Sequence, residues 1–174
     1  MLEKHGRQSF KNDLNILYII IYKMATNSAY ESIPYNLSIK DKTINEYVQL
    51  IHKYNCEQSG WNFTPLKPGA FGYDNLVVSF HHVISNSLAL HKNNKLSDEN
   101  LEEVSDLVHE GWCKNYLYWT HNEPYIHNTN YIKPYAALGD DVRNMCARTL
   151  YKDLPEDQKQ KDRIIAKAII DIFN

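Results

Sequence analysis

The chain has 174 residues, of which 43% are hydrophobic and 23% are charged, so it can bury a core and is not intrinsically disordered. Its net charge of −2 argues against a nucleic-acid polymer as partner, because proteins of that class concentrate positive charge. Three widely spaced cysteines argue against a disulfide framework or a zinc knuckle; they are Cys56, Cys113 and Cys146. We therefore expect a protein of the reducing cytoplasm.

The first 24 residues form a distinct apolar segment. Residues 14–24 cover only about one third to one half of the length that a bilayer-crossing helix needs. They follow Lys4, Arg7 and Lys11, as in a secretory signal, but a clear small-residue cleavage site is lacking. A core or docking helix, or a leader before a natural start at Met24, is favoured over secretion, and no membrane partner is expected.

Residues 25–174 are expected to form a single helical domain. Ser38 is a suitable N-cap, and apolar residues recur at helical spacing behind it, which predicts a helix over residues 39–56. Residues 60–73 are then interrupted by glycines and prolines and carry several aromatic side chains. This composition predicts an irregular loop that is packed by its own aromatic residues.

Two helices are predicted in the middle of the chain. The apolar pattern favours a helix over residues 75–92, although residues 77–80 also fit the start of a strand. Ser97 begins a second helix, whose acidic first turn suits the helix dipole. Gly111 weakens that helix by roughly 1 kcal/mol relative to alanine, so we expect a close contact there. The apolar stripe of the helix consists of Leu101, Val104, Val108, Trp112 and Tyr116.

The last part of the chain predicts one more loop and two more helices. Residues 120–134 form a second loop rich in Asn, His and Tyr, and a short helix extends from about residue 140 to Leu150. Leu154 and Pro155 open the final helix, because proline suits a first-turn position. The fold class predicted from these elements is all-α: a compact single domain of five or six helices with two aromatic-rich loops.

An ordered set of residues in the second half resembles a known family. It comprises a His and a Trp one helical turn apart, an aromatic-Leu-Pro turn, and an Asp-Arg pair before an apolar helix. These residues are His109, Trp112, Tyr151, Leu154, Pro155, Asp162 and Arg163. In this order they resemble the RyR domain, a small helical module of ryanodine receptors that also occurs alone in bacteria and phages. The resemblance covers residues 97–173, with a longer stretch before the Leu-Pro turn than the family usually has.

The resemblance implies a binding module rather than an enzyme. RyR modules of bacteria and phages look like binders of nucleotide-type signals, including signals of antiphage immunity. The implied function is a phage sponge that sequesters a cyclic-nucleotide or ADP-ribose-type messenger in the host cytoplasm, as a homo-oligomer. Two alternatives remain open: a hydrolase that cleaves such a signal, and a protein-interaction module that inhibits a host effector.

The same part of the chain contains the candidate ligand site. We expect an imidazole, an indole and a guanidinium to converge around one cavity, because a base stacks on aromatic rings and a guanidinium binds phosphate. The structural alternative is a buried Trp beside a hydrogen-bonded His, ordinary packing of the other aromatics, and an ion pair of the Arg with Asp153 or Glu156. The ligand-binding candidates are His109, Trp112, Tyr116, Trp119, Tyr151 and Arg163.

Motifs for metal binding and catalysis are lacking in the sequence. His81 and His82 are adjacent, so they cannot both face one ion from a helix, and the His-Glu pair at 109–110 lacks the second histidine of a zinc hydrolase. The chain has no G-x-S-x-G motif, no P-loop and no G-x-G-x-x-G motif. We therefore expect no metal, no cofactor and no catalytic residue.

Overall fold

The fold is all-α, as the sequence predicts. The structure, a computed structural model, describes residues 38–90, 96–121 and 141–174. Within these ranges its helices are α2 (Ile44–Ser59), α3 (Phe71–Leu90), α4 (Leu101–His121), α6 (Asp141–Cys146) and α7 (Glu156–Phe173). Two 3₁₀ turns, η1 (Asp98–Asn100) and η2 (Tyr151–Asp153), precede α4 and α7. The predicted apolar segment 1–24 and residues 122–134 of the second predicted loop lie outside the described residues.

A short β-hairpin precedes α2, where the sequence pattern predicts a helix from residue 39. β1 (Ser38–Ile39) pairs antiparallel with β2 (Lys42–Thr43). The predicted N-cap, Ser38, is wrong because Thr43 caps the helix: its side chain accepts the Glu46 N–H, and Glu46 Oε2 accepts the Thr43 N–H at 2.7 Å. This reciprocal capping box satisfies two backbone donors and sets the start of α2.

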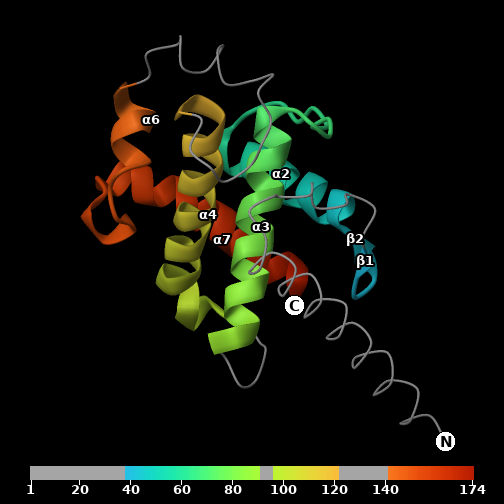
Figure 1. The fold of residues 1–174 in the computed structure, drawn as a ribbon. Coiled ribbons are helices and arrows are strands. Elements are labelled where there is room, and N and C mark those ends of the chain that lie inside the picture. Colours follow the sequence, from blue (N-terminus) through green and yellow to red (C-terminus); the bar gives the residue numbers. More distant parts are fainter. Residues whose placement is uncertain (1–37, 91–95, 122–140) are drawn as a thin grey trace, which may run out of the picture.

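Four long helices enclose a common core. In Figure 1, α3 and α4 lie side by side, α7 crosses behind them, and α2 packs against α7 and α3. The rings of Tyr47 and Phe80 stack with 4.8 Å between centroids, and such pairs add about 0.5–1.5 kcal/mol to the burial energy. All four helices supply fully buried side chains, among them Ile44, Tyr47, Phe80, Val83, Val104 and Ile169.

The backbones of α3 and α4 approach each other closely at Gly111, which confirms the predicted close contact. A Cβ at this glycine would lie 2.8 Å from the Ser79 Cα and 3.2 Å from the His82 Cβ. One turn further along, the Asn115 Nδ2 donates to the Asn75 Oδ1 at 2.9 Å and links the same two helices. The glycine therefore sets the distance between two helices that both line the candidate site.

The other predicted elements are present with shifted ends. Helix α3 begins earlier, at Phe71, and residues 77–80 are helical rather than a strand. The Ser97 hydroxyl donates to the Asn100 side chain at 2.7 Å and caps no backbone N–H. Pro155 occupies the N-cap position of α7. The predicted stripe of α4 includes three buried members, Val104, Val108 and Tyr116.

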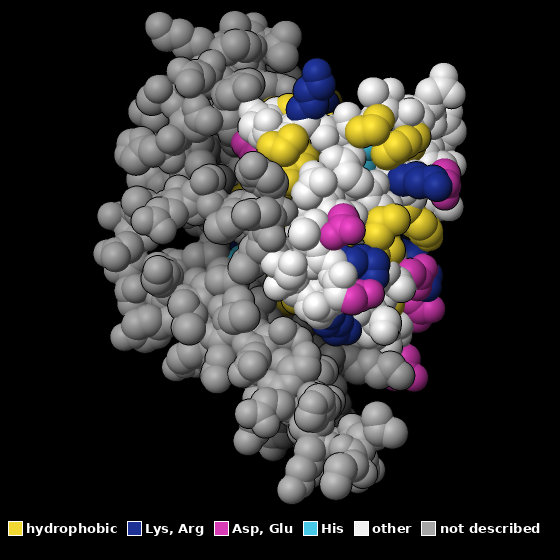
Figure 2. Space-filling model, turned by 90° about the vertical axis from the view of Figure 1, so that its right-hand side faces the viewer, with side chains coloured by type: hydrophobic (Ala, Val, Ile, Leu, Met, Phe, Trp, Pro, Cys, Tyr) yellow, Lys and Arg dark blue, Asp and Glu magenta, His cyan; other side chains and the backbone are white. Residues whose placement is uncertain are grey.

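Figure 2 shows the face of the molecule that lies to the right in Figure 1. On its described part, basic and acidic side chains lie close together, and apolar side chains form several small groups. This part of the face therefore presents neither a continuous basic surface nor one broad apolar patch. Among the described helices, none is long and apolar enough to cross a bilayer.

Candidate functional site

A cavity of about 640 Å³ lies among α2, α3, α4, α6 and α7. Its volume falls within the range of roughly 300–1,000 Å³ that is typical of small-ligand sites. Apolar side chains form much of the wall. The aromatic, amide and charged side chains that bear on its chemistry include Trp61, Asn75, His109, Trp112, Arg143, Lys161 and Asp162.

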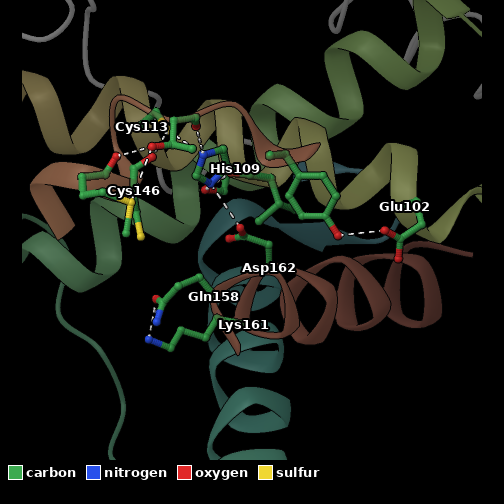
Figure 3. Close-up of polar contacts among 12 residues, drawn as sticks. Glu102, His109, Cys113, Cys146, Gln158, Lys161 and Asp162 are labelled. Atoms are coloured by element: carbon green, nitrogen blue, oxygen red, sulfur yellow. Dashed lines mark hydrogen bonds and ion pairs between the residues drawn. The ribbon is translucent and has the colours of Figure 1, made fainter. Parts of the chain in front are cut away.

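His109 joins α4 to α7 in the wall of the cavity. It is only 3% exposed. Its Nδ1 lies 3.1 Å from Asp162 Oδ2 and its Nε2 lies 2.9 Å from the Thr149 carbonyl oxygen (Figure 3). Because both oxygens accept, each ring nitrogen donates, and the imidazole is a cation. The Cys113 Sγ lies 3.2 Å from the same Nε2.

The protonation state of His109 follows from these contacts. Burial by itself lowers the pKa of His109, but the hydrogen bonds with Asp162, Cys113 and the Thr149 carbonyl outweigh burial and raise that pKa to about 10. Burial also raises the pKa of the Asp162 carboxyl group, and His109 counteracts this rise. At neutral pH the two side chains form an ion pair between α4 and α7.

Trp112 lies between two other rings along α4. Its ring centroid is 6.0 Å from that of His109 and 5.0 Å from that of Tyr116, with interplanar angles of 22° and 20°. Tyr116 is 2% exposed and donates its hydroxyl to Asn144 Oδ1 at 3.0 Å. The Trp112 indole is therefore stacked with two neighbouring rings of the same helix. Of these three rings, His109 and Trp112 line the cavity and Tyr116 does not.

Tyr151 and Arg163, two further predicted ligand residues, do not line the cavity, although the Tyr151 ring lies 6.2 Å from the His109 ring between centroids. The Arg163 guanidinium donates to Glu102 through Nε at 2.5 Å and Nη2 at 3.1 Å, and to Glu156 through Nη1. The buried Tyr151 donates its hydroxyl to Glu102 at 3.1 Å. Two carboxylates thus neutralise this guanidinium. Arg163 therefore forms the ion pair that was the structural alternative to a role in ligand binding. The side chain of the sixth candidate, Trp119, lies outside the described residues.

The geometry of α7 explains why Asp162 faces the cavity and Arg163 does not. Successive residues of an α-helix point about 100° apart, whereas residues at i, i+3, i+4 and i+7 share one face. Gln158, Lys161, Asp162 and Ile165 have this spacing, and all four line the cavity. The spacing can be read from the sequence, but the partner of this face cannot.

The loop between α2 and α3 brings Trp61 to the edge of the cavity. The prediction that its aromatic side chains pack the loop is wrong for Trp61 and Phe63, which are 64% and 41% exposed. Gln49 holds the loop instead: its Nε2 donates to the Leu66 carbonyl at 2.7 Å, and its Oε1 accepts the Leu66 N–H at 3.0 Å. A fixed loop therefore presents an indole with an accessible ring surface.

Charged side chains form part of the cavity wall. His109 and Asp162 neutralise each other, and the basic side chains of Arg143 and Lys161 line the same wall. The Lys161 Nζ is oriented by a hydrogen bond of 2.8 Å to Gln158 Oε1. Within the described ranges, no three His, Cys, Asp or Glu side chains form a group able to hold a metal ion.

The chain matches no model of a known family, no curated protein and no solved structure. Its resemblance to the RyR domain therefore stays a prediction from the sequence. What the site is able to do is inferred from the cavity itself, that is, from its volume, its charges and its hydrogen-bonding groups.

Proposed function

We propose that the protein binds a small nucleotide-type ligand in this cavity and holds it without cleaving it. The observation that carries the proposal is that the indole of Trp61 and the cations of Arg143 and Lys161 border the same space of about 640 Å³. A nucleotide combines a flat base with an anionic phosphate, and these wall groups are complementary to both parts. Sequestration of a nucleotide signal requires binding of this kind and no chemical step.

The state of His109 supports binding rather than hydrolysis. A general base needs a nitrogen lone pair, and both nitrogens of this buried ring donate to oxygen acceptors. His109 therefore acts as a fixed cation that keeps Asp162 ionised and positions it in the wall. We accordingly assign His109 and Trp112 a supporting role in the site, and Trp61, Arg143 and Lys161 direct contact with the ligand.

Isothermal titration against AMP, GMP, cyclic di-AMP and ADP-ribose tests this proposal. We expect saturable binding of at least one of them, and recovery of the intact ligand by chromatography after heat denaturation of the complex. Lys161→Gln should weaken that binding, because it removes one cation from the wall. Lys53→Gln, an exposed position on α2 outside the cavity, is the matched control. The absence of binding to all four compounds would overturn the proposal.

Substitution of Trp61 tests whether the base stacks on its indole. Stacking of a base on an aromatic side chain contributes about 1–3 kcal/mol, so Trp61→Ala should weaken binding by about 5- to 150-fold. Phe63→Ala is the control, since Phe63 is an exposed aromatic of the same loop that does not line the cavity. Equal effects of the two substitutions would contradict a stacking role for Trp61.

One arrangement favours a hydrolase as the second candidate. A thiol, an imidazole and a carboxylate follow one another, as in a cysteine hydrolase. The Cys113 Sγ lies 3.2 Å from His109 Nε2, and His109 Nδ1 lies 3.1 Å from Asp162 Oδ2. Against this role, Cys113 does not line the cavity, and the Thr149 carbonyl lies closer to Nε2 than the thiol does. Cleavage of a nucleotide by the wild type, abolished in Cys113→Ala, would establish the hydrolase and exclude simple sequestration.

A further inference from the structure

The Asp162 carboxylate offers a hydrogen-bond acceptor to the cavity. Its Oδ2 is 3.1 Å from His109 Nδ1, and His109 is the one hydrogen-bond partner of this carboxylate among the described residues. The side chain lines the cavity and keeps 15% of its surface exposed. In Figure 3 it extends from α7 toward His109, and a single dashed line joins its carboxylate to the imidazole. Oδ1 is therefore available to a ligand that donates.

The ion pair with His109 keeps this acceptor ionised. A protonated carboxyl group donates as well as accepts, but a carboxylate only accepts. Because the neighbouring imidazolium favours the charged form of Asp162, a ligand that approaches Oδ1 must bring a donor. A ligand atom with a lone pair at this position would be repelled.

Asn75 supplies the complementary group from α3. Its Oδ1 accepts from Asn115 Nδ2 at 2.9 Å, and this bond fixes the orientation of the amide. The Nδ2 of Asn75 is therefore left as a donor, on a side chain that lines the cavity. The wall thus contains an acceptor on α7 and a donor on α3, in addition to its cations.

From this hydrogen-bonding pattern, and resting on the proposed function above, we propose that the preferred base is guanine. The guanine edge carries two adjacent donors, N1–H and the 2-amino group, together with the O6 acceptor. The two donors suit the Asp162 carboxylate, and O6 suits an N–H donor such as that of Asn75. Adenine places the lone pair of its N1 beside its amino group, and xanthine places a carbonyl at position 2. Both would bring a lone pair toward the carboxylate.

Calorimetric titration of the wild-type protein with GMP, IMP, AMP and XMP tests the preference. Hydrogen bonds to a charged group are the strong ones, so we expect GMP to bind about 10- to 100-fold more tightly than AMP or XMP. IMP retains N1–H and lacks the 2-amino group, so its affinity should be intermediate. Equal affinities for GMP and AMP would overturn the guanine inference and leave the proposed function intact. If all four nucleotides fail to bind while cyclic di-AMP or ADP-ribose binds, the guanine inference alone is overturned.

The Asp162→Asn variant tests whether this side chain determines the preference for guanine. The amide oxygen still accepts from His109, and the amide N–H then faces the ligand as a donor. We expect the ratio of GMP to XMP affinity to fall at least about tenfold, because the new donor suits the xanthine carbonyl. Asp171→Asn, an exposed position on α7 that pairs with Lys167, is the control with the same charge change. An unchanged ratio in a folded Asp162→Asn protein would overturn the inference; if that variant does not fold, the wild-type ranking of the four nucleotides decides.

Discussion

Replacement of Gly111 by alanine tests the close packing of α3 against α4. Alanine is the better helix former by roughly 1 kcal/mol, so α4 taken alone would become more stable. In the folded protein, however, the new methyl carbon would lie 2.8 Å from the Ser79 Cα and 3.2 Å from the His82 Cβ. Optimal carbon–carbon contacts are about 3.5–4.0 Å. Because one neighbour is backbone, the two helices must move apart, and we expect a net loss of about 1–3 kcal/mol in the free energy of unfolding.

Gly72→Ala is the matched control for this substitution. Gly72 lies in the first turn of α3, and its added Cβ would meet only the Leu66 Cδ2, at an ordinary distance of 3.7 Å. This variant should gain about 0.4–1 kcal/mol, because alanine reduces the conformational entropy of the unfolded chain. Urea unfolding followed by far-UV circular dichroism measures both variants. A Gly111→Ala protein as stable as the wild type would refute the close approach of the helices.

Three further predictions concern stability. The pKa of His109 is raised in the folded protein from 6.5 to about 10, so, where Asp162 is ionised, protonation of His109 stabilises the fold most near pH 6.5 and progressively less as the pH rises toward 10. Urea midpoints between pH 6.5 and 9.5 should fall more steeply for the wild type than for His109→Gln, and parallel slopes would contradict the ion pair. Burial raises the pKa of Asp74 from 3.8 to about 6, so ionisation of this carboxyl opposes folding increasingly as the pH rises from 3.8 to 6. Because the side chain is partly exposed, we expect Asp74→Asn to add only roughly 1–2 kcal/mol to the free energy of unfolding at pH 7 and little at pH 3.5. A variant that is less stable than the wild type at pH 7 would refute this account. Thr43→Ala removes the side-chain cap of α2 and should lower that free energy by about 1 kcal/mol at neutral pH; Ser38→Ala, at the N-cap predicted from the sequence, should have no comparable effect.

Periodic features of the chain were predictable because each depends on residues within one helix. Spacing alone predicts the stripe of α4, and Gly111 indicates a contact point because a glycine inside a strong helix carries a cost. The start of α2 was missed although its capping box is local. Two polar residues near the start of α2, Ser38 and Thr43, both suit an N-cap, and only Thr43 has a glutamate three residues later to reciprocate.

The composition of the candidate site was only partly predictable, because it depends on which helix faces which. His109 and Trp112 line the cavity, but the cations and the accessible indole that accompany them come from α6, α7 and the loop after α2. Arg143 and Trp61 are separated from His109 by tens of residues of sequence. No spacing rule connects positions so distant, since their proximity is decided by packing.

The sequence by itself determined an all-α chain, the main helices and the apolar faces that they bury, because hydrophobic periodicity and helix breakers act over a few residues. Tertiary structure alone decided that Asp162 points at His109 while the adjacent Arg163 points at Glu102 and Glu156. A turn of about 100° per residue separates these two side chains. The helices packed on either side of α7 therefore determine which charge borders the cavity and which is neutralised outside it.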